Sequence, residues 1–243
     1  MIPDPIAMRF QGISLDVTRS FQNSPENPTP WAPFTGFATV ISYHLSTWIK
    51  GQRLDVPQAT GLMIYLVQPH VGDKTHWWDN TFCVTLTTPT AAEMKALATP
   101  ADVFDTLLRA TATGIDRAAA ALDLDANAFK RRLWQLPECN HMVTHLLHTR
   151  RPRGLGLQMS FEARMTRHAL DVDFVIHDTK GERYRETVQT SVPSPLALAK
   201  RFRRIDLTDG IVSTPGRLMR PGQTLGTADI AYYHWSRALS DMI

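Results

Sequence analysis

LGLQMSFEARMTRHALDVDFVI, residues 155–176, decides the fold class of this chain. Apolar side chains occupy every second position from Leu155 onward, and the alternation resumes at Leu170. Such a pattern predicts two β-strands that bury one face and leave the other in water. The next segment, HDTKGERY at 177–184, predicts a turn into a third strand over 184–190. We therefore expect an antiparallel meander in the C-terminal third of the chain.

The N-terminal part predicts further strands around one helix. Residues 13–17 alternate between apolar and polar side chains, as a half-buried strand does. The apolar run LMIYLV at 62–67 predicts a central strand, and FCVTLT at 82–87 predicts a second strand that can pair with it. Between the first strand and the central strand, apolar residues recur at helical spacing over 37–48, which predicts a helix. Gly51 is expected to end that helix.

Residues 90–149 carry repeated helix-start signals followed by apolar residues at helical spacing. Because this helical segment lies between the N-terminal and C-terminal strands, we expect it to be inserted between them. The expected N-caps are Thr90, Thr99, Asp125 and Asn140.

After the meander, the sequence predicts a short basic helix over 195–202, a hairpin that turns at Asp209–Gly210, and a final helix that begins at Asp229 and contains Trp235. No linker, repeat or low-complexity segment divides the chain. We therefore predict a single α+β domain over residues 1–243, in which a largely antiparallel sheet with a C-terminal meander packs against several amphipathic helices.

Composition indicates an ordinary folded protein. The 243 residues are 43% hydrophobic and 20% charged, with a formal net charge of +3, which is a mildly basic balance. No apolar run reaches the roughly 20 residues that span a bilayer, and the first residues do not form a secretory signal. Cys83 and Cys139 are too far apart in sequence to form a CxxC pair. We expect a cytoplasmic protein with reduced cysteines, no cofactor and no membrane partner.

Three histidines lie in CNHMVTHLLHTRRPRG, residues 139–154. If Asn140 caps a helix, these histidines share one narrow stripe opposite the apolar side, and the stripe faces away from the core. Such a stripe is either a solvated helix face or a partner-binding surface, and a metal site is the third alternative. The candidate residues of this surface are His141, His145 and His148, continued by Arg150 and Arg151.

The segment HVGDKTHWWDN, residues 70–80, is interpreted as a loop between two strands. Its polar residues His70, Asp73, His76 and Asp79 recur at every third position, and such residues bind metals or transfer protons. The adjacent Trp77 and Trp78 are typical of an aromatic anchor in an interface. The three alternatives are a solvated loop, a protein interface and a catalytic or metal site.

Basic residues gather at 130–132, 150–153 and 200–204 and could neutralise phosphates. They are equally typical of solvated helix ends, and the small net charge argues against a dedicated nucleic-acid binder. Standard enzyme motifs such as GxxxxGK[ST], GxSxG and HExxH are absent from the sequence.

The function that we predict from these patterns is a non-enzymatic, cytoplasmic protein-binding module, such as an inhibitor or immunity-type protein that blocks a partner's active surface. One alternative is an RNA-binding or metal-independent RNA-cleaving protein that uses His and Arg residues, and another is a metal-dependent enzyme that uses the His70–Asp79 loop. We assign no catalytic or metal-binding residue. The expected partner-binding residues are Trp77, Trp78, His76, Asp79, His141, His145, His148, Arg150 and Arg151.

Overall fold

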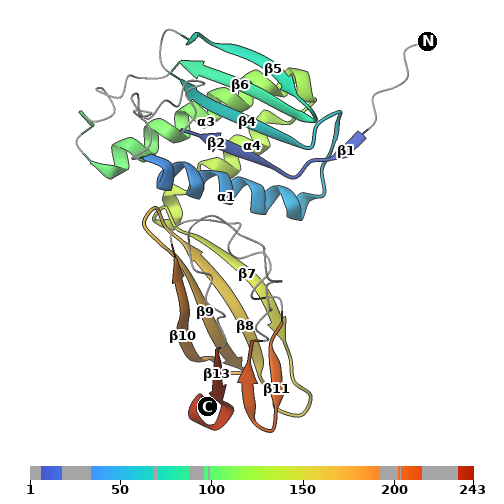
Figure 1. Cartoon of the computed structure of the whole chain (residues 1–243), viewed down its shortest axis with the longest axis vertical. Helices are drawn as coiled ribbons and strands as arrows, with labels where there is room; N and C mark the ends of the chain where they lie inside the picture. The colour runs from blue at the N-terminus through green and yellow to red at the C-terminus, as the bar shows by residue number, and fades with distance from the viewer. Residues whose placement is uncertain are drawn as a thin grey trace, which may run out of the picture. The chain divides into compact units, whose positions relative to one another are not determined.

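The computed structural model describes residues 7–17, 34–67, 71–87, 96–97, 99–191, 202, 204–214 and 235–243 (Figure 1). The chain divides into two compact units. Unit 1 comprises Met1–Val143 with Thr166–His168, and unit 2 comprises Thr144–Met165 with Ala169–Ile243. Among the described residues, no helix combines the length and the apolar character needed to cross a membrane.

A four-stranded sheet forms the centre of unit 1 and consists, in spatial order, of β2 (Gly12–Asp16), β4 (Gly61–Val67), β6 (Thr81–Thr87) and β5 (Lys74–Trp78) (Figure 1). The first three strands run parallel, and β5 runs antiparallel to β6. β2 buries Ile13 and Leu15 and leaves its other residues half-buried, which confirms the predicted alternation. A separate antiparallel pair joins β1 (Ala7–Arg9) to β3 (Asp55–Pro57).

The helices of unit 1 are α1 (Thr35–Gln52), α3 (Pro100–Leu122) and α4 (Ala126–Leu133), followed by a 3-10 turn at Pro137–Cys139. Thr99 and Asp125 are N-caps, as predicted, because each side chain accepts a hydrogen bond from a backbone N–H of the first turn. Gly114 lets α3 approach the sheet closely, since a Cβ atom there would lie 2.6 Å from Cδ1 of Ile64. α1 ends at a left-handed Arg53, so the prediction that Gly51 ends the helix was wrong.

Two glycines of α1 give a matched test of its packing. A Cβ at Gly36 would lie 2.2 Å from the backbone oxygen of Arg167, whereas a Cβ at Gly51 would meet nothing within 4 Å. We expect Gly36→Ala to lower the free energy of unfolding by about 1–3 kcal/mol, because the backbone of Arg167 must move. We expect Gly51→Ala to raise it by about 0.5–1 kcal/mol through helix propensity. Denaturant unfolding of both variants measures the difference, and equal stabilities would contradict this packing.

Unit 2 contains a sheet of β10 (Gly181–Ser191), β9 (Leu170–Asp178), β8 (Gln158–Met165) and β7 (Val143–Arg150), in that spatial order, and a small sheet of β11 (Asp206–Thr208), β12 (Ile211–Ser213) and β13 (Ser236–Ala238). β9 pairs antiparallel with both β8 and β10. One face of the larger sheet buries Phe161 and Phe174, which pack with Phe202 and Trp235. β11 and β12 form the predicted hairpin, since Asp209 and Gly210 have the positive φ angles of a tight turn.

The predicted mixture of α and β structure with mostly antiparallel sheets is confirmed, although β2, β4 and β6 are parallel. The prediction of a helical segment up to residue 149 was wrong, because residues 143–150 form β7. Trp235 was also misassigned, since it precedes β13 and lies in no helix. The expected capping residue Thr90 and the start of the final helix at Asp229 lie outside the described residues.

The prediction of one domain over residues 1–243 stays a prediction. Two compact units can still unfold together when enough contacts join them. A single denaturation transition, without proteolytic fragments that fold independently, is the result that a single domain requires.

Candidate functional site

The segment predicted as a loop at residues 70–80 contains the strand β5, so the loop interpretation was wrong for Lys74–Trp78. β5 pairs with β6 from Lys74 opposite Thr85 to Trp78 opposite Thr81. The register leaves two residues, Asp79 and Asn80, to form the turn between the strands. Threonine and tryptophan favour strands, and a two-residue polar turn is the usual hairpin connection, so a strand is the better interpretation of the segment.

Alternate residues of β5 point to opposite faces of the sheet. Trp77 lies on the face that carries Phe82, with the two ring centroids 5.0 Å apart. His76 lies on the other face, directly opposite Cys83, and its Nδ1 is buried without a hydrogen-bond partner among the described residues. Trp78 shares that second face. The two tryptophans are 43% and 52% exposed, so β5 presents aromatic surface on both faces.

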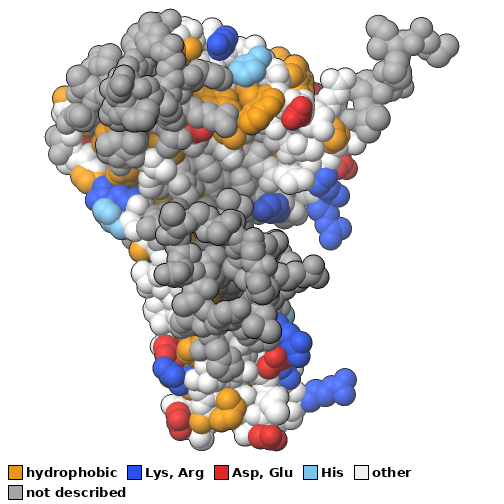
Figure 2. Space-filling view, in the orientation of Figure 1, with side chains coloured by type: hydrophobic (Ala, Val, Ile, Leu, Met, Phe, Trp, Pro, Cys, Tyr) orange, Lys and Arg blue, Asp and Glu red, His pale blue; other side chains and the backbone are white. Residues whose placement is uncertain are grey.

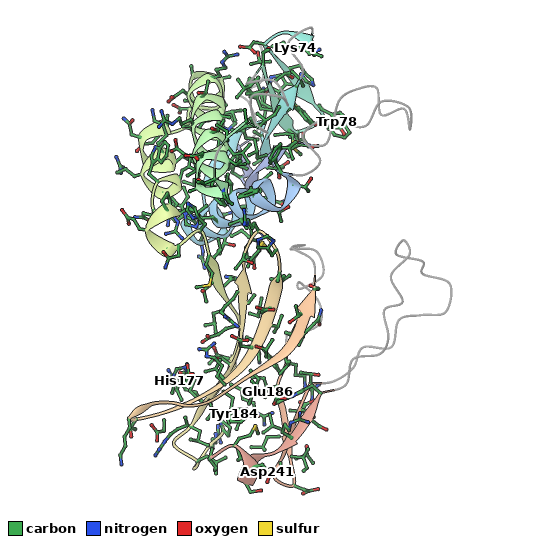
Figure 3. All side chains as sticks on the ribbon, turned by 90° about the vertical axis from the view of Figure 1, so that its left-hand side faces the viewer. Lys74, Trp78, His177, Tyr184, Glu186 and Asp241 are labelled. Atoms are coloured by element: carbon green, nitrogen blue, oxygen red, sulfur yellow. The ribbon has the colours of Figure 1, made fainter. Side chains whose placement is uncertain are left out.

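The surface around β5 can be followed in Figures 2 and 3. Figure 2 shows hydrophobic side chains beside a histidine on the part of unit 1 that carries β5, and Figure 3 shows Lys74 and Trp78 at the two ends of the strand. The structure therefore brings together four predicted site residues, His76, Trp77, Trp78 and Asp79, in one hairpin.

The two edges of the unit 1 sheet differ. At the β2 edge, the N–H of Leu15 donates to Oγ of Ser42 at 2.8 Å, and Oγ of Ser46 donates to the carbonyl of Ile13 at 3.2 Å. Two serines of α1 therefore satisfy two backbone groups on the outer edge of β2. At the other edge, within the described residues, β5 is paired on one side only, with β6. An edge strand with unpaired backbone groups is a template for another strand.

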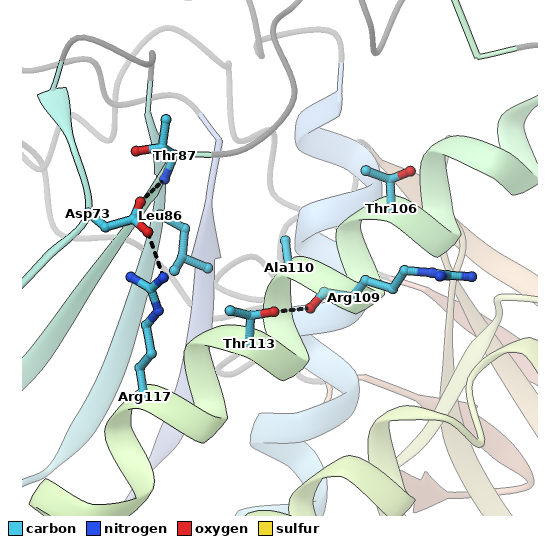
Figure 4. Close-up of a pocket in the computed structure, with 8 residues that line it drawn as sticks. All are labelled: Asp73, Leu86, Thr87, Thr106, Arg109, Ala110, Thr113 and Arg117. Carbon is cyan, nitrogen blue, oxygen red and sulfur yellow. Dashed lines mark hydrogen bonds and ion pairs between the residues drawn. The ribbon is translucent and has the colours of Figure 1, made fainter.

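A pocket of about 290 Å³ lies between α3, the end of β6 and Asp73 (Figure 4). Asp73 accepts hydrogen bonds from the backbone N–H of Thr87 and from the guanidinium of Arg117. The bonds from Thr87 and then that from Arg117 hold the pKa of Asp73 below its ordinary value, so the carboxylate is ionised at neutral pH. Arg109 also lines the pocket, and its guanidinium donates to the carboxylate of Asp105 at 2.8 Å, so each arginine of the pocket already faces a carboxylate.

Asp73 and His76 are not placed to share a metal ion. Asp73 bonds to Arg117 on α3, whereas His76 lies on the other face of the sheet with Cys83. His70 lies outside the described residues. Across the part of the chain that the structure describes, no three His, Cys, Asp or Glu residues are grouped so that they could hold a metal ion.

The three histidines do not lie on one helical stripe, because residues 143–150 form a strand, so that prediction was wrong. His141 precedes β7 with a left-handed φ of 56° and belongs to unit 1. Its ring lies 4.3 Å from that of Phe104, and burial, followed by the charge of Arg167, lowers its pKa. His145 and His148 are both in β7, where residues three apart point to opposite faces.

Many of the basic residues form contacts within their own unit. Nη1 of Arg150 donates to the carbonyl of Ile205 at 2.6 Å, and Nε of Arg151 donates to Gln158 at 2.8 Å. In the 130–132 cluster, Lys130 pairs with Asp116 at 2.7 Å. The carboxylate of Asp116 offsets the charge of Lys130, whereas the bonds of Arg150 and Arg151 are to uncharged groups and fix the orientation of their guanidiniums.

A charge network on β8, β9 and β10 was not predicted from the sequence. The fully buried carboxylate of Asp173 accepts hydrogen bonds from Arg164 at 2.7 Å, Arg185 at 2.9 Å and Thr187 at 2.8 Å. The alternating pattern of these strands could have indicated it, because the polar positions of each predicted strand carry charged residues, and such residues become neighbours when the strands pair. The network joins three strands, and we therefore expect it to stabilise the sheet of unit 2.

Comparison with known proteins found no family model, curated protein or solved structure that matches this chain. Function is therefore inferred from the geometry of the described residues. Of the predicted site residues, four lie together in the β5 hairpin and the others lie elsewhere: His141 in unit 1, and His145, His148, Arg150 and Arg151 in unit 2.

Proposed function

We propose that this protein is a non-enzymatic binding module that contacts another protein through the β5 hairpin. The observation that supports the proposal is the pair of exposed tryptophans on a strand that, among the described residues, is paired on one side only. Tryptophan is the side chain most enriched among residues that dominate binding energy, because its large ring buries much apolar area with little loss of conformational entropy.

An inhibitor or immunity-type role in the cytoplasm fits such a module. A protein of this kind covers the working surface of its partner, and it needs a rigid contact rather than reactive groups. β5 supplies rigidity because all five of its residues are in register with β6. Trp77 is further held against Phe82, so little side-chain freedom is lost when a partner covers it.

The RNA alternative receives less support from the described residues. RNA binding needs cations that are available to phosphates and aromatic rings that stack on bases. Arg150 and Arg151 each use part of their guanidinium in a hydrogen bond to a neighbouring group of unit 2. The metal-dependent alternative is weakened by the separation of Asp73 from His76 on opposite faces of the sheet.

We expect Trp78→Ala to weaken association with the natural partner by about 2 kcal/mol or more, or roughly 30-fold in the dissociation constant. The partner is the protein that copurifies with the full chain at fixed stoichiometry, and calorimetric titration of the two purified proteins measures the affinity. Trp134→Ala is the matched control, because Trp134 is also exposed, at 38%, but lies at the end of α4 in unit 1. We expect the control to change the affinity by less than about twofold.

Equal losses in Trp78→Ala and Trp134→Ala would show that β5 is not the contact. A different outcome would favour nucleic acid: if Arg150→Ala and Arg151→Ala each reduced the slope of log affinity against log salt by nearly one unit, counterion release would drive binding. If the tryptophan substitutions left the affinity unchanged and the arginine substitutions had that effect on the salt dependence, the RNA alternative would be favoured over the present proposal.

A further inference from the structure

We infer that the partner binds by adding an extended strand of its own, antiparallel, to the outer edge of β5. This inference rests on the proposed function, because it specifies how the same hairpin would engage another protein. Three features of unit 1 support it: the direction of the backbone groups of β5, the difference between the two sheet edges, and the distribution of charge along the strand.

The pairing register fixes which backbone groups point outward. Trp78 is opposite Thr81 across a two-residue turn, and in such a hairpin this closing pair exchanges hydrogen bonds. Hydrogen-bonded and non-bonded pairs then alternate along an antiparallel ladder. Thr75 and Trp77 are therefore at non-bonded positions, and their N–H and C=O groups point away from β6. These groups are the ones that an added strand would pair with.

The two edges of the sheet differ in what the described residues place beside them. Ser42 and Ser46 bond to the outer backbone groups of β2, whereas β5 is paired with β6 alone among the described strands. Proline and β-bulges commonly block exposed edges. β5 contains no proline, and its five pairs with β6 follow one another without a register shift. The strand is therefore regular enough to template another strand.

Charge along β5 indicates the chemistry of the added strand. Lys74 begins the strand, as Figure 3 shows, and Asp79 follows its other end. Both residues are exposed. An antiparallel strand complements them when a basic residue opens it opposite Asp79 and an acidic residue ends it opposite Lys74. On the face shared with Phe82, Thr75 and Trp77 require apolar neighbours, for which β-branched residues are best suited. The occupant is thus an extended segment with alternating β-branched apolar residues between a basic and an acidic end.

The probe is a synthetic peptide, Lys-Thr-Val-Thr-Val-Glu with blocked ends, titrated into the 243-residue protein while tryptophan fluorescence is recorded. We expect saturable binding below about 1 mM, about tenfold weaker binding in Thr75→Pro, and unchanged binding in Thr75→Val. Proline removes the outward N–H without breaking a bond to β6, and valine keeps that N–H. We also expect the reversed-charge peptide, Glu-Thr-Val-Thr-Val-Lys, to bind less tightly.

Hydrogen exchange provides a second measurement that does not depend on the folding of a proline variant. We expect the wild-type amides of Thr75 and Trp77 to become protected when the peptide binds. No saturable binding, or equal binding by Thr75→Pro and Thr75→Val without new protection, would overturn strand addition. If Trp78→Ala still weakened the natural complex, the proposed function would stand without it. Self-association abolished by Thr75→Pro would assign the edge to a second copy of the chain and overturn the inference.

Discussion

Phe161→Ala is expected to lower the free energy of unfolding by about 3–5 kcal/mol, the range for removal of a large aromatic side chain from a packed core. Phe161 is fully buried, and its ring centroid lies 5.4 Å from that of Phe174 and 5.0 Å from that of Phe202. Trp235 packs against the same ring at 6.2 Å. The substitution removes one member of this aromatic cluster and leaves a cavity that the strand backbone of β8 and β9 cannot close.

Guanidinium unfolding followed by near-ultraviolet circular dichroism measures this loss. Glu162→Gln is the control, since Glu162 is the next residue of β8 and its side chain lies on the polar face with Arg185. We expect the control to cost less than about 1 kcal/mol, because Arg185 keeps its bonds to Asp173 and Glu182. A loss at Glu162 comparable to that at Phe161 would mean that the two faces of β8 are assigned the wrong way round.

β8 and β9 of unit 2 were predictable because apolar and polar residues alternate over most of each strand. In β8, Met159, Phe161, Ala163 and Met165 are buried, as the period of two requires. The turn at Asp209–Gly210 was equally clear, because the Asp-Gly pair favours the positive φ angles that the structure shows. Local chemistry alone is sufficient in both places.

The region after Pro137 shows where local patterns fail. VTHLLHTR, residues 143–150, contains leucines and histidines at helical spacing, and yet it forms β7. The strand order places β7 beside β8 in the sheet, and pairing of this kind is a tertiary contact that a single-sequence pattern does not contain. The same error placed His141, His145 and His148 on one stripe, so the predicted histidine surface failed together with the predicted helix.

The candidate site was predictable in its residues but not in its geometry. The sequence indicates Trp77 and Trp78 because paired tryptophans in a polar segment are typical of binding surfaces. Their position on an edge strand depends on the pairing of β5 with β6, and the contrast with the β2 edge depends on Ser42 and Ser46 of α1. Side chains from distant segments create this contrast, and the sequence patterns did not indicate it.

The second large effect is expected at Asp173, where Asp173→Asn should lower the free energy of unfolding by about 2–3 kcal/mol at neutral pH. The carboxylate is fully buried and bonds to Arg164 and Arg185, whose side chains are 36% and 34% exposed. Removing the charge leaves two guanidiniums facing a neutral amide. The cost is below that of a fully buried pair, because water still reaches both arginines and screens them.

The pH dependence of this effect follows from the pKa of Asp173. Burial alone would raise that pKa, but the hydrogen bonds from Arg164, Thr187 and Arg185 outweigh burial and hold it below its ordinary value. The carboxylate of Asp173 therefore binds a proton less readily in the folded state than in the unfolded chain, where the pKa of an aspartate is about 3.9. Stability from Asp173 is complete above that pH and is lost as the pH falls through the lower, folded-state pKa. The gap between wild type and Asp173→Asn should consequently be widest above about pH 5 and should shrink below about pH 4.

Asp171→Asn separates this effect from a general effect of removing charge from β9. Asp171 accepts a hydrogen bond from Thr190 at 2.8 Å and lies 3.7 Å from Arg164, with its side chain 27% exposed. We expect its loss to cost less than about 1 kcal/mol, because a single long and partly solvated ion pair contributes little. Urea unfolding from pH 3 to pH 7 compares the two variants with wild type. Equal losses of unfolding free energy in the two variants, or a stability difference at Asp173 that stays constant with pH, would show that the ionised carboxylate does not hold the network. A stability difference that disappears in acid for Asp173→Asn alone would identify this buried charge as the group that joins β8, β9 and β10.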